Sequence, residues 1–321
     1  MFKKIFKVIK KYDNIVLARH IGVDPDAMAS QVGLRDAIKL TFPNKNVYAV
    51  GTGGGKFSFL GGLDHFEGDY SKTLLIVTDT PDKRRVDCLD VDKFAYKIKI
   101  DHHPFVEEFC DLEYIDDKAS SACELIIRMI YNTKLQANKD IMEKLFQGLV
   151  SDTNRFLFSN STSNTFEIVS KVLKDYDLEI THLYANLMMR PLSEIKLQGY
   201  MIDNMKVTDN GVGYMIITDD VLKEYNVDVA SPGNLINNFN YINEILVWVA
   251  VTEDNKNELF KANIRSRGPV INLVAEKYNG GGHKLASGAK MKTMEEVDTL
   301  IKELDKVVGD YLKENGDSNE D

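Results

Sequence analysis

Carboxylate and imidazole side chains follow several short apolar segments of the sequence. Asp101, His102 and His103 come directly after residues 96–100, which have the apolar pattern of a buried strand. Three other segments end in similar groups: His20, Asp24 and Asp26 follow residues 15–18, Asp79 follows residues 73–78, and Asp152 follows a helical segment at 141–150. In open α/β sheets, ligands bind beyond the carboxyl ends of the strands. We therefore expect these side chains to meet at one edge of one sheet.

Six of these residues offer mostly oxygen ligands to a metal: His20, Asp24, Asp26, Asp79, His102 and Asp152. Such a set favours Mn²⁺ or Mg²⁺ over Zn²⁺, whose structural sites usually contain cysteine. The number of ligands suits two ions about 3.5–4 Å apart, which would lower the pKa of a bound water and hold phosphoryl oxygens during in-line attack. Taken singly, each aspartate could be a helix cap or a turn residue, and the histidines could be core or surface residues. Their joint occurrence favours the two-metal interpretation.

The elements that would position these residues alternate between strands and helices. The pattern predicts strands at 15–18, 46–50, 73–78 and 96–100, and helices at 27–40, 120–131, 141–150 and 164–174. Ser121 and Glu124 have the spacing of a capping box for the helix at 120–131. This alternation predicts an α/β fold with a doubly wound, mostly parallel sheet.

A second, smaller α/β domain follows a helical segment at 178–205 that is interrupted at Arg190-Pro191. Its predicted elements are strands at 212–217, 245–251 and 259–264, a hairpin turn at 252–258, a helix at 269–278, a loop at 279–283 and a helix at 294–312 capped by Thr293. The predicted divisions are a catalytic domain at 1–180, a helical linker at 181–207, a second domain at 208–314 and an acidic, disordered tail at 315–321.

Two segments of the second domain carry groups that suit phosphate oxygens. Arg265, Ser266 and Arg267 place two guanidinium groups beside a hydroxyl at the end of a strand. Residues 280–282 are three glycines followed by His283, and their backbone N–H groups could approach a ligand closely. By themselves the three glycines are only a flexible loop. They become a phosphate site if Arg265 lies on an adjoining element.

Composition limits the classes of function. The formal charge of −9 argues against a general nucleic-acid coat, so an anionic substrate would be held locally by metals and a few basic side chains. The three cysteines form no C-x-x-C pair, which indicates reduced thiols and a cytoplasmic protein. Residues 1–11 lack the features of a signal peptide, and a helix docked on its own domain is favoured over a membrane-surface helix. No segment approaches the ~20 apolar residues of a membrane span.

The motifs together resemble the stand-alone DHH–DHHA1 phosphoesterases of the NrnA-like oligoribonuclease and pAp phosphatase type. The motifs that match, in order along the chain, are His20-Ile-Gly-Val-Asp24-Pro-Asp26, Thr78-Asp79-Thr80, Asp101-His102-His103, Ser151-Asp152-Thr153, Arg265-Ser266-Arg267 and Gly280-Gly-Gly-His283-Lys-Leu-Ala-Ser-Gly288. This chain departs from the family pattern at Ala29 and Asn154, where family members often have glycine. Neither position is a ligand, so the departures bear on loop shape and substrate preference.

The resemblance implies a role for each site residue. One Mn²⁺ would be held by His20, Asp24 and Asp79, and the other by Asp26, Asp79, His102 and Asp152, with Asp79 bridging. Among the remaining catalytic residues, His103 would contact the scissile phosphate or assist the leaving oxygen, and Asp101 would orient a histidine. The nucleotide part of the substrate would be bound by Arg265, Ser266, Arg267, Gly281, Gly282 and His283.

The leading hypothesis is a Mn²⁺-dependent hydrolase that cleaves short oligoribonucleotides, pApA and 3′-phosphoadenosine 5′-phosphate by attack of a metal-bridging hydroxide on phosphorus. Mg²⁺ is the alternative metal, and a cyclic dinucleotide phosphodiesterase is the alternative function. A RecJ-type single-strand exonuclease is disfavoured by chain length and acidity, and a pyrophosphatase by the Gly-Gly-Gly-His segment. A nucleotide-binding protein without activity is disfavoured because every ligand position is filled. The sequence leaves open the preferred nucleotide, the direction of cleavage, the metal and whether the protein forms a homodimer; it predicts neither a long nucleic acid nor a membrane as partner.

Overall fold

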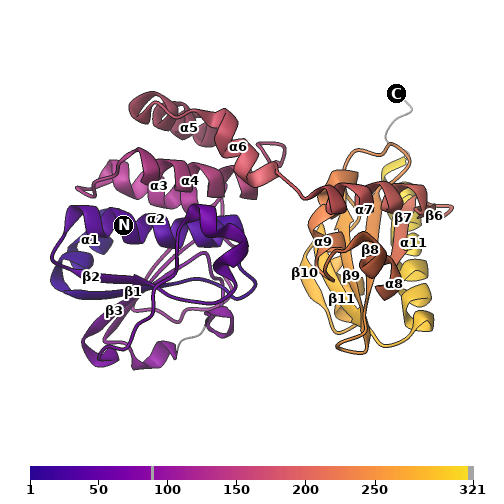
Figure 1. Cartoon of the computed structure of the whole chain (residues 1–321), viewed down its shortest axis with the longest axis horizontal. Coiled ribbons are helices and arrows are strands. Elements are labelled where there is room, and N and C mark those ends of the chain that lie inside the picture. Colours follow the sequence, from indigo (N-terminus) through magenta and orange to yellow (C-terminus); the bar gives the residue numbers. More distant parts are fainter. Residues whose placement is uncertain (88–89, 317–321) are drawn as a thin grey trace. The chain divides into compact units, whose positions relative to one another are not determined.

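The chain divides into two compact units, Met1–Met189 and Arg190–Asp321, in a computed structural model that describes residues 1–87 and 90–316 (Figure 1). The division falls inside the predicted linker, between helix α6 (Ile180–Met188) and helix α7 (Leu192–Asp203). Helix α11 (Met294–Gly316) includes the first two residues of the predicted tail, and the rest of that tail lies outside the described residues. Cys88 also lies outside them, while Cys110 and Cys123 are free, buried thiols.

The first unit contains a five-stranded sheet in which every pair of neighbours is parallel. Its strands are β1 (Asn14–Ala18), β2 (Asn46–Ala49), β3 (Thr73–Thr78), β4 (Tyr96–Asp101) and β5 (Leu112–Ile115), in the order β2-β1-β3-β4-β5. This arrangement confirms the predicted α/β class and parallel sheet. Strand β5 is not among the predicted elements, because its residues are all half-buried and lack the clear apolar pattern of the inner strands.

Side chains alternate between two differently covered faces of this sheet. Ile15, Leu17 and Ile76 pack with the helices, whereas Val16 and Val77 belong to a separate cluster on the opposite face. The helices stack above one face (Figure 1): α1 (Phe2–Lys11), α2 (Pro25–Thr41), α3 (Ala122–Asn132), α4 (Lys139–Asp152), α5 (Ser163–Tyr176) and α6. Short 3₁₀ helices occur in the connections: η1 (Gly54–Leu60), η2 (Tyr70–Lys72), η3 (Lys83–Arg85) and η4 (Val91–Lys93).

Helix α1 docks on its own domain, as predicted. Ile5 and Ile9 are fully buried on its inner face, while Phe2 and Phe6 pack partly buried against the same core. The apolar spacing of this helix is therefore explained by packing within the first unit.

The strand order creates a switch point at the sheet edge where the predicted ligands lie. From β1 the chain passes to β2 on one side, and then to β3 on the other side of β1. Crevices at such reversals are the usual ligand sites of open α/β sheets. His20 follows β1 and Asp79 follows β3, so both leave adjacent strands at this point.

The second unit contains a six-stranded mixed sheet between two helical layers. Its strands are β6 (Lys206–Val207), β7 (Val212–Ile217), β8 (Val247–Asp254), β9 (Leu259–Ser266), β10 (Gly281–His283) and β11 (Ala286–Met291), in the order β10-β11-β9-β8-β7-β6. Only β7 and β8 are parallel among these described strands. One face packs against α11 and α10 (Asn272–Glu276). The other packs against α7, α8 (Asp219–Tyr225) and α9 (Ser231–Leu235), with the 3₁₀ helix η5 (Ile236–Phe239) after α9.

This unit departs from the predicted elements at its glycines. The pattern predicts a loop at 279–283, but Gly281–His283 form strand β10 and pair with β11. A Cβ atom on Gly282 would lie 2.6 Å from the carbonyl oxygen of Ala286, so only glycine permits this approach. The predicted helix at 269–278 is also shorter, since α10 covers only Asn272–Glu276. Strands β6 and β11 and helices α8 and α9 are not among the predicted elements.

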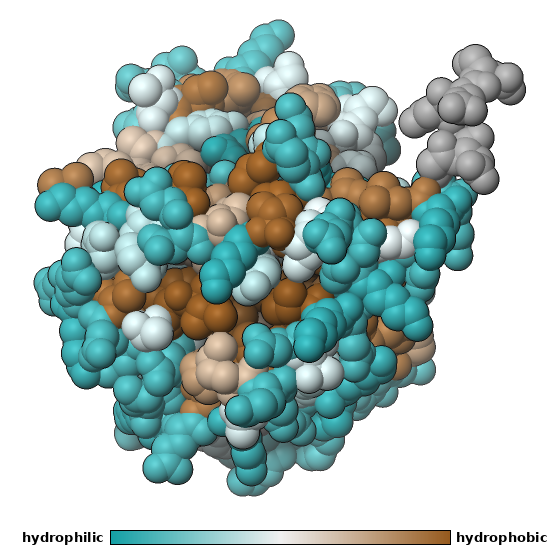
Figure 2. Space-filling view, turned by 90° about the vertical axis from the view of Figure 1, so that its right-hand side faces the viewer, coloured by the Kyte–Doolittle hydropathy of each residue, from teal (hydrophilic) through white to brown (hydrophobic). Residues whose placement is uncertain are grey.

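No helix within the described residues is long and apolar enough to cross a membrane. Large apolar side chains are nevertheless exposed on the second unit, among them Val207, Tyr241 and Leu273. On the face shown in Figure 2, apolar groups form separate patches between hydrophilic side chains.

Candidate metal centre

Hydrogen bonds of Arg19 hold the start of the loop after β1, which carries His20. The buried Arg19 guanidinium donates to Asp87 (Nη1–Oδ2 2.7 Å) and to the carbonyl oxygen of His20 (2.9 Å). The backbone N–H of Asp87 donates to the carbonyl of Arg19 at 2.9 Å, and His20 pairs with Val86 as a short antiparallel bridge. The His20 Nδ1 atom lies 2.8 Å from the carbonyl oxygen of Ile21, which turns Nε2 toward the carboxylates.

Asp24 and Asp26 take their positions from the start of helix α2. Asp24 is the N-cap: its Oδ1 accepts from the Ala27 N–H at 2.9 Å, and its Oδ2 lies 3.5 Å from His20 Nε2. A cap and a metal ligand are therefore compatible roles for this residue. Asp26, in the first turn, is buried and accepts from the backbone N–H groups of Ala122 (2.8 Å) and Cys123 (2.9 Å) at the start of α3. The positive end of α3 stabilises this carboxylate.

Asp79 lies between two histidines that come from different strands. Its backbone has a left-handed φ of 51° directly after β3. One carboxylate oxygen, Oδ2, lies 3.4 Å from Nε2 of His20, and the other, Oδ1, lies 3.3 Å from Nε2 of His102. The Oδ1 atom is buried, and no donor among the described residues is aligned to hydrogen-bond to it. Burial of an unsatisfied carboxylate oxygen is costly, so a cation is the missing partner that chemistry suggests.

His102 faces the remaining carboxylates. Its Nε2 atom lies 3.5 Å from Oδ2 of Asp152, at the end of α4, and 3.9 Å from Oδ2 of Asp26. The other ring nitrogen, Nδ1, lies 3.4 Å from the carbonyl oxygen of Ala119, which holds the ring in this orientation.

Asp101 orients His103. Its Oδ1 lies 2.8 Å from Nδ1 of His103 and also accepts from the backbone N–H groups of His102 (2.9 Å) and His103 (3.3 Å). The His103 Nδ1 atom lies 3.4 Å from Asp79 Oδ1, so this ring stands beside the same carboxylate as the predicted ligands. An imidazole that donates from Nδ1 to a carboxylate has Nε2 turned away from that carboxylate, where it can act on a substrate.

The pKa values of these groups show crowded, buried carboxylates. Burial raises the pKa of Asp26 to about 7, helped by the charge of Asp79, and burial with the neighbouring aspartates raises that of Asp152. Burial alone would also raise the pKa of Asp79, but His102 and His20 outweigh it and hold that value well below the usual range. Burial lowers the pKa of His20, but its pairing with Asp24 and Asp79 prevails and raises the value to about 10. Bound cations would replace these protons and relieve the repulsion.

All six predicted ligands come together in this arrangement. Three groups have ligand atoms within 4.8 Å of one another: His20, Asp24 and Asp79; Asp26, His102 and Asp152; and Asp79, His102 and His103. Asp79 belongs to two of them and lies between the first and the second. The donor atoms are carboxylate oxygens and imidazole nitrogens, which fit a pair of hard divalent ions.

In the second unit, the register places Arg265 and His283 in one row across the sheet. His283 is opposite Ala286, and Ala286 is opposite Arg265, so the three side chains share one face. The half-buried Arg265 guanidinium donates to Oδ1 of Asn237 at 3.1 Å. His283 is exposed.

The other predicted binding residues of this unit make local bonds. The Ser266 hydroxyl donates to the carbonyl of Pro269 at 2.7 Å, and Nη2 of Arg267 donates to the carbonyls of Ile242 (2.6 Å) and Ile245 (2.5 Å). Gly281 and Gly282 form strand β10. Of the predicted set, Arg265 and His283 are therefore the side chains that the sheet presents together on one face.

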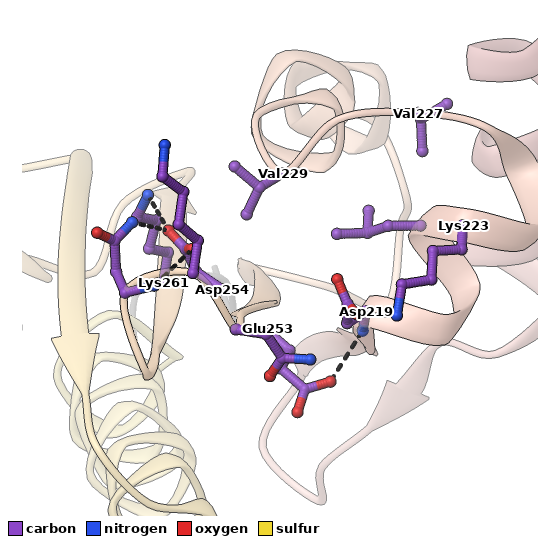
Figure 3. A pocket seen from close by; sticks show the side chains of 11 residues that line it. Asp219, Lys223, Val227, Val229, Glu253, Asp254 and Lys261 are labelled. Carbon is purple, nitrogen blue, oxygen red and sulfur yellow. Dashed lines mark hydrogen bonds and ion pairs between the residues drawn. The ribbon is translucent and has the colours of Figure 1, made fainter.

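A separate pocket of about 350 Å³ lies where β8 ends and β9 begins (Figure 3). Its charged side chains pair with one another: Lys223 lies 2.5 Å from Asp219, and Lys261 lies 2.5 Å from Asp254. Arg265 is near the other end of β9, so this pocket is distinct from the predicted nucleotide-binding residues. Because these charges are already paired, the pocket has no strong requirement for a charged ligand.

Two supporting residues were not identified as functional from the sequence. In the sequence, Arg19 is simply the residue at the end of a strand. Its charge next to a buried apolar segment was the signal that could have indicated its supporting role. Glu124 was predicted to complete a capping box with Ser121, but its carboxylate instead accepts from the N–H and hydroxyl of Ser120 and from Thr165. Ser121 itself caps α3, as predicted. Glu124 thus helps to hold the helix start that binds Asp26.

Comparisons with known proteins give one family match in each of the two compact units. Residues 14–151 match the N-terminal domain of the DHH family, and residues 211–310 match the DHHA1 domain. The bifunctional oligoribonuclease and PAP phosphatase NrnA of Bacillus subtilis is 35% identical over 309 residues, covering 95% of this chain and 98% of the relative. The probable bifunctional oligoribonuclease and PAP phosphatase NrnA of Streptococcus mutans is 36% identical over 304 residues, covering 94% and 97%.

A solved structure shares the fold. The crystal structure of an exopolyphosphatase-related protein from Bacteroides fragilis has a TM-score of 0.83 at 22% identity, covering 96% of this chain and 97% of that one. At this identity the likeness supports the architecture alone.

Proposed function

Because this chain belongs to the DHH family of phosphoesterases with a DHHA1 domain, we propose that it is a two-metal hydrolase of short oligoribonucleotides and 3′-phosphoadenosine 5′-phosphate. The observation that carries the proposal is the position of Asp79, whose two oxygens each approach a histidine of a different ligand group. A single carboxylate in this position can hold two ions at the short separation that phosphoryl transfer uses. The names of the relatives from Bacillus subtilis and Streptococcus mutans support the substrate class.

Each predicted ligand has a place in this proposal. One ion would be held by His20, Asp24 and Asp79, and the other by Asp26, Asp79, His102 and Asp152. The mostly oxygen ligands favour Mn²⁺, with Mg²⁺ as the alternative. When bound, the ions supply a water of lowered pKa and positive charge for the phosphate oxygens.

The chain's own residues carry the remaining chemistry. Asp101 accepts from Nδ1 of His103, which fixes the ring and leaves Nε2 to give a proton to the leaving oxygen. The carbonyls of Ile21 and Ala119 orient His20 and His102, so that both present Nε2. The N-terminus of helix α3 donates two backbone N–H groups to Asp26 and so stabilises its negative charge against the effect of burial.

In the second unit, Arg265 and His283 would bind the nucleotide part of the substrate. A guanidinium can pair with phosphate oxygens, and an imidazole can stack on or hydrogen-bond to a base. Their common face on the sheet supports a shared role. Arg267 and Ser266 would act indirectly, by holding the turn that follows β9.

The proposal is tested by comparing turnover of five substrates with Mn²⁺: an RNA dinucleotide, a long single-stranded RNA, pAp, pApA and cyclic di-AMP. Fast cleavage of the dinucleotides and pAp, with the long strand nearly intact, is the expected result. Processive loss of the long strand would indicate a RecJ-type exonuclease, and preference for cyclic di-AMP would indicate a signalling phosphodiesterase. No hydrolysis of any of the five would refute the proposed substrate class.

A further inference from the structure

The turn after the metal ligand Asp152 has an unusual backbone. Asn154, Arg155 and Phe156 have φ values of 45°, 64° and 67°, so three successive residues other than glycine are left-handed. Single residues of this kind are uncommon, and successive ones are strained because each Cβ crowds the neighbouring carbonyl. Strain of this kind collects at functional sites.

Helix capping accounts for the first of the three residues but not for the other two. The N–H of Arg155 donates to the carbonyl of Val150 (2.8 Å), and the N–H of Asn154 donates to that of Ser151 (3.0 Å). These two bonds form a Schellman motif, which requires one left-handed residue, here Asn154. Arg155 is the last residue of the motif, which does not require it to be left-handed, and Phe156 lies beyond the motif, so the conformation of these two residues has another cause.

The turn is held firmly in this form. The Thr153 hydroxyl donates to the carbonyl of Leu149 (2.8 Å) and accepts from the N–H of Phe156 (3.1 Å). The N–H groups of Leu157 and Phe158 both donate to the carbonyl of Thr153, at 3.0 and 3.1 Å. The position of Arg155 is therefore fixed relative to the end of α4, where Asp152 lies.

Arg155 has more donors than the described residues offer it acceptors. Its half-buried guanidinium makes one side-chain hydrogen bond, from Nη2 to Oδ1 of Asn154 at 3.1 Å. Within residues 1–87 and 90–316, no carboxylate lies within ion-pair distance of it, and Nδ2 of Asn154 is buried without a partner. Its charge also acts on the phenol of Tyr184, whose pKa is raised by burial and lowered by Arg155. A half-buried guanidinium with open donors suits an anion.

The Arg155 side chain is close enough in the chain to Asp152 to contact an anion at the metal centre. Three residues of chain span at most about 10 Å, so the Cα atom of Arg155 is within that distance of Asp152. A long, flexible side chain can extend from there toward a group held by the metals.

We propose that Arg155 binds a non-bridging oxygen of the substrate phosphate at the metal centre. The inference rests on the proposed function for the identity of the substrate, but its ligand chemistry, a phosphate oxygen, can be tested without turnover. On this basis the strained turn is retained because it carries Arg155 to the phosphate. A purely structural reason for the turn, such as burying the Phe156 ring against Phe166, makes the opposite prediction for Arg155 variants.

The test uses the full chain loaded with Mn²⁺ and three variants, Arg155→Lys, Arg155→Gln and Arg155→Gly. Binding of inorganic phosphate is measured by calorimetry, together with Mn²⁺ affinity, Tm and dinucleotide turnover. We expect Arg155→Gln to weaken phosphate binding by about 10-fold or more, because a charge-assisted hydrogen bond is lost, and Arg155→Lys to restore part of it. Arg155→Gly should show an equal or higher Tm, since glycine accepts a positive φ, and yet bind phosphate as weakly as Arg155→Gln.

Lys134→Gln is the matched control, because it removes one positive charge at an exposed position of the same unit. This variant should bind phosphate as the wild type does. Phosphate affinity that is unchanged in Arg155→Gln and Arg155→Gly, or a wild type that binds no phosphate, would overturn the inference. If phosphate binding depends on Arg155 but none of the nucleotides is hydrolysed, the inference stands and the proposed substrate class fails.

Discussion

Asp79→Asn is the substitution that most directly tests whether one carboxylate joins two metal ions. The amide has nearly the shape of the carboxylate, but one of its two terminal atoms is a donor rather than an acceptor. Because the oxygens of Asp79 lie 3.4 Å from His20 Nε2 and 3.3 Å from His102 Nε2, either orientation of the amide turns its NH₂ group toward one ligand group. If Asp79 bridges two ions, the bridge would then be lost at one of them, whichever way the side chain is placed.

The size of the effect follows from the proposed role of Asp79 as a ligand of both ions. Even residues that only support metal ligands change affinity or activity by about 10- to 100-fold when mutated. Loss of the bridging ligand should therefore weaken one of two Mn²⁺ ions by at least about 100-fold and reduce turnover by at least the same factor. Loss of its charge should also lower the pKa of Asp26, which the charge of Asp79 helps to raise.

The measurement is Mn²⁺ stoichiometry and affinity by calorimetry, with dinucleotide turnover on the same samples and thermal unfolding of the metal-free protein. Asp203→Asn, an exposed position in the second unit, is the control for a change of the same chemistry elsewhere. A variant that still binds two ions with the affinity of the wild type, or that keeps most of its turnover, would refute the bridging role.

Three further predictions concern pH, proton transfer and packing. Mn²⁺ affinity should rise by about 10-fold per pH unit between pH 7 and 9 for each proton that the metal displaces. The reason is that His20, whose pKa without metal is about 10, must lose its proton before it can bind the ion. An affinity that calorimetry finds independent of pH would contradict this prediction. His103→Gln should lower kcat by about 10²–10⁴-fold, and Asp101→Asn should lower it by about 10- to 100-fold. Mn²⁺ affinity should be nearly unchanged in both variants. If His103→Gln instead weakened Mn²⁺ binding as much as it lowers turnover, His103 would be a metal ligand. Gly148→Ala should destabilise the metal-free protein by about 1–3 kcal/mol in urea unfolding, since its Cβ would lie 2.9 Å from Cβ of Ala29; an unchanged midpoint would show that the helices can separate without cost.

The convergence of the predicted ligands could be anticipated from the sequence because it follows from a simple rule of sheet geometry. His20, Asp79 and His102 each come directly after a short apolar strand, and the carboxyl ends of parallel strands meet at one edge. The sequence does not determine which histidine Asp101 orients, because His102 and His103 are the next two residues in the chain. That choice depends on side-chain direction, and the structure places Asp101 on Nδ1 of His103.

The interactions that hold the centre were harder to foresee because they join residues far apart in sequence. Asp26 is held by N–H groups of α3 almost a hundred residues later, and Arg19 by Asp87. No local spacing encodes either contact, since both depend on how α2 packs beside α3 and on how the loop after β3 returns to β1. The left-handed conformation of Arg155 is equally invisible, because arginine has no preference for it.

The second unit shows why glycine misleads when strands are inferred from composition. Glycine is depleted in strands, so residues 280–282 predict a loop. In the structure the same lack of side chains lets β10 lie against β11, where a Cβ on Gly280 would fall 2.7 Å from Cα of Ala289. This close pairing sets the row in which His283 and Arg265 share a face, one strand apart from each other. The glycines therefore contribute to the proposed nucleotide site through the strand register that they permit. A Gly282→Ala variant should weaken nucleotide binding because it shifts His283, even though no side chain of the site is removed.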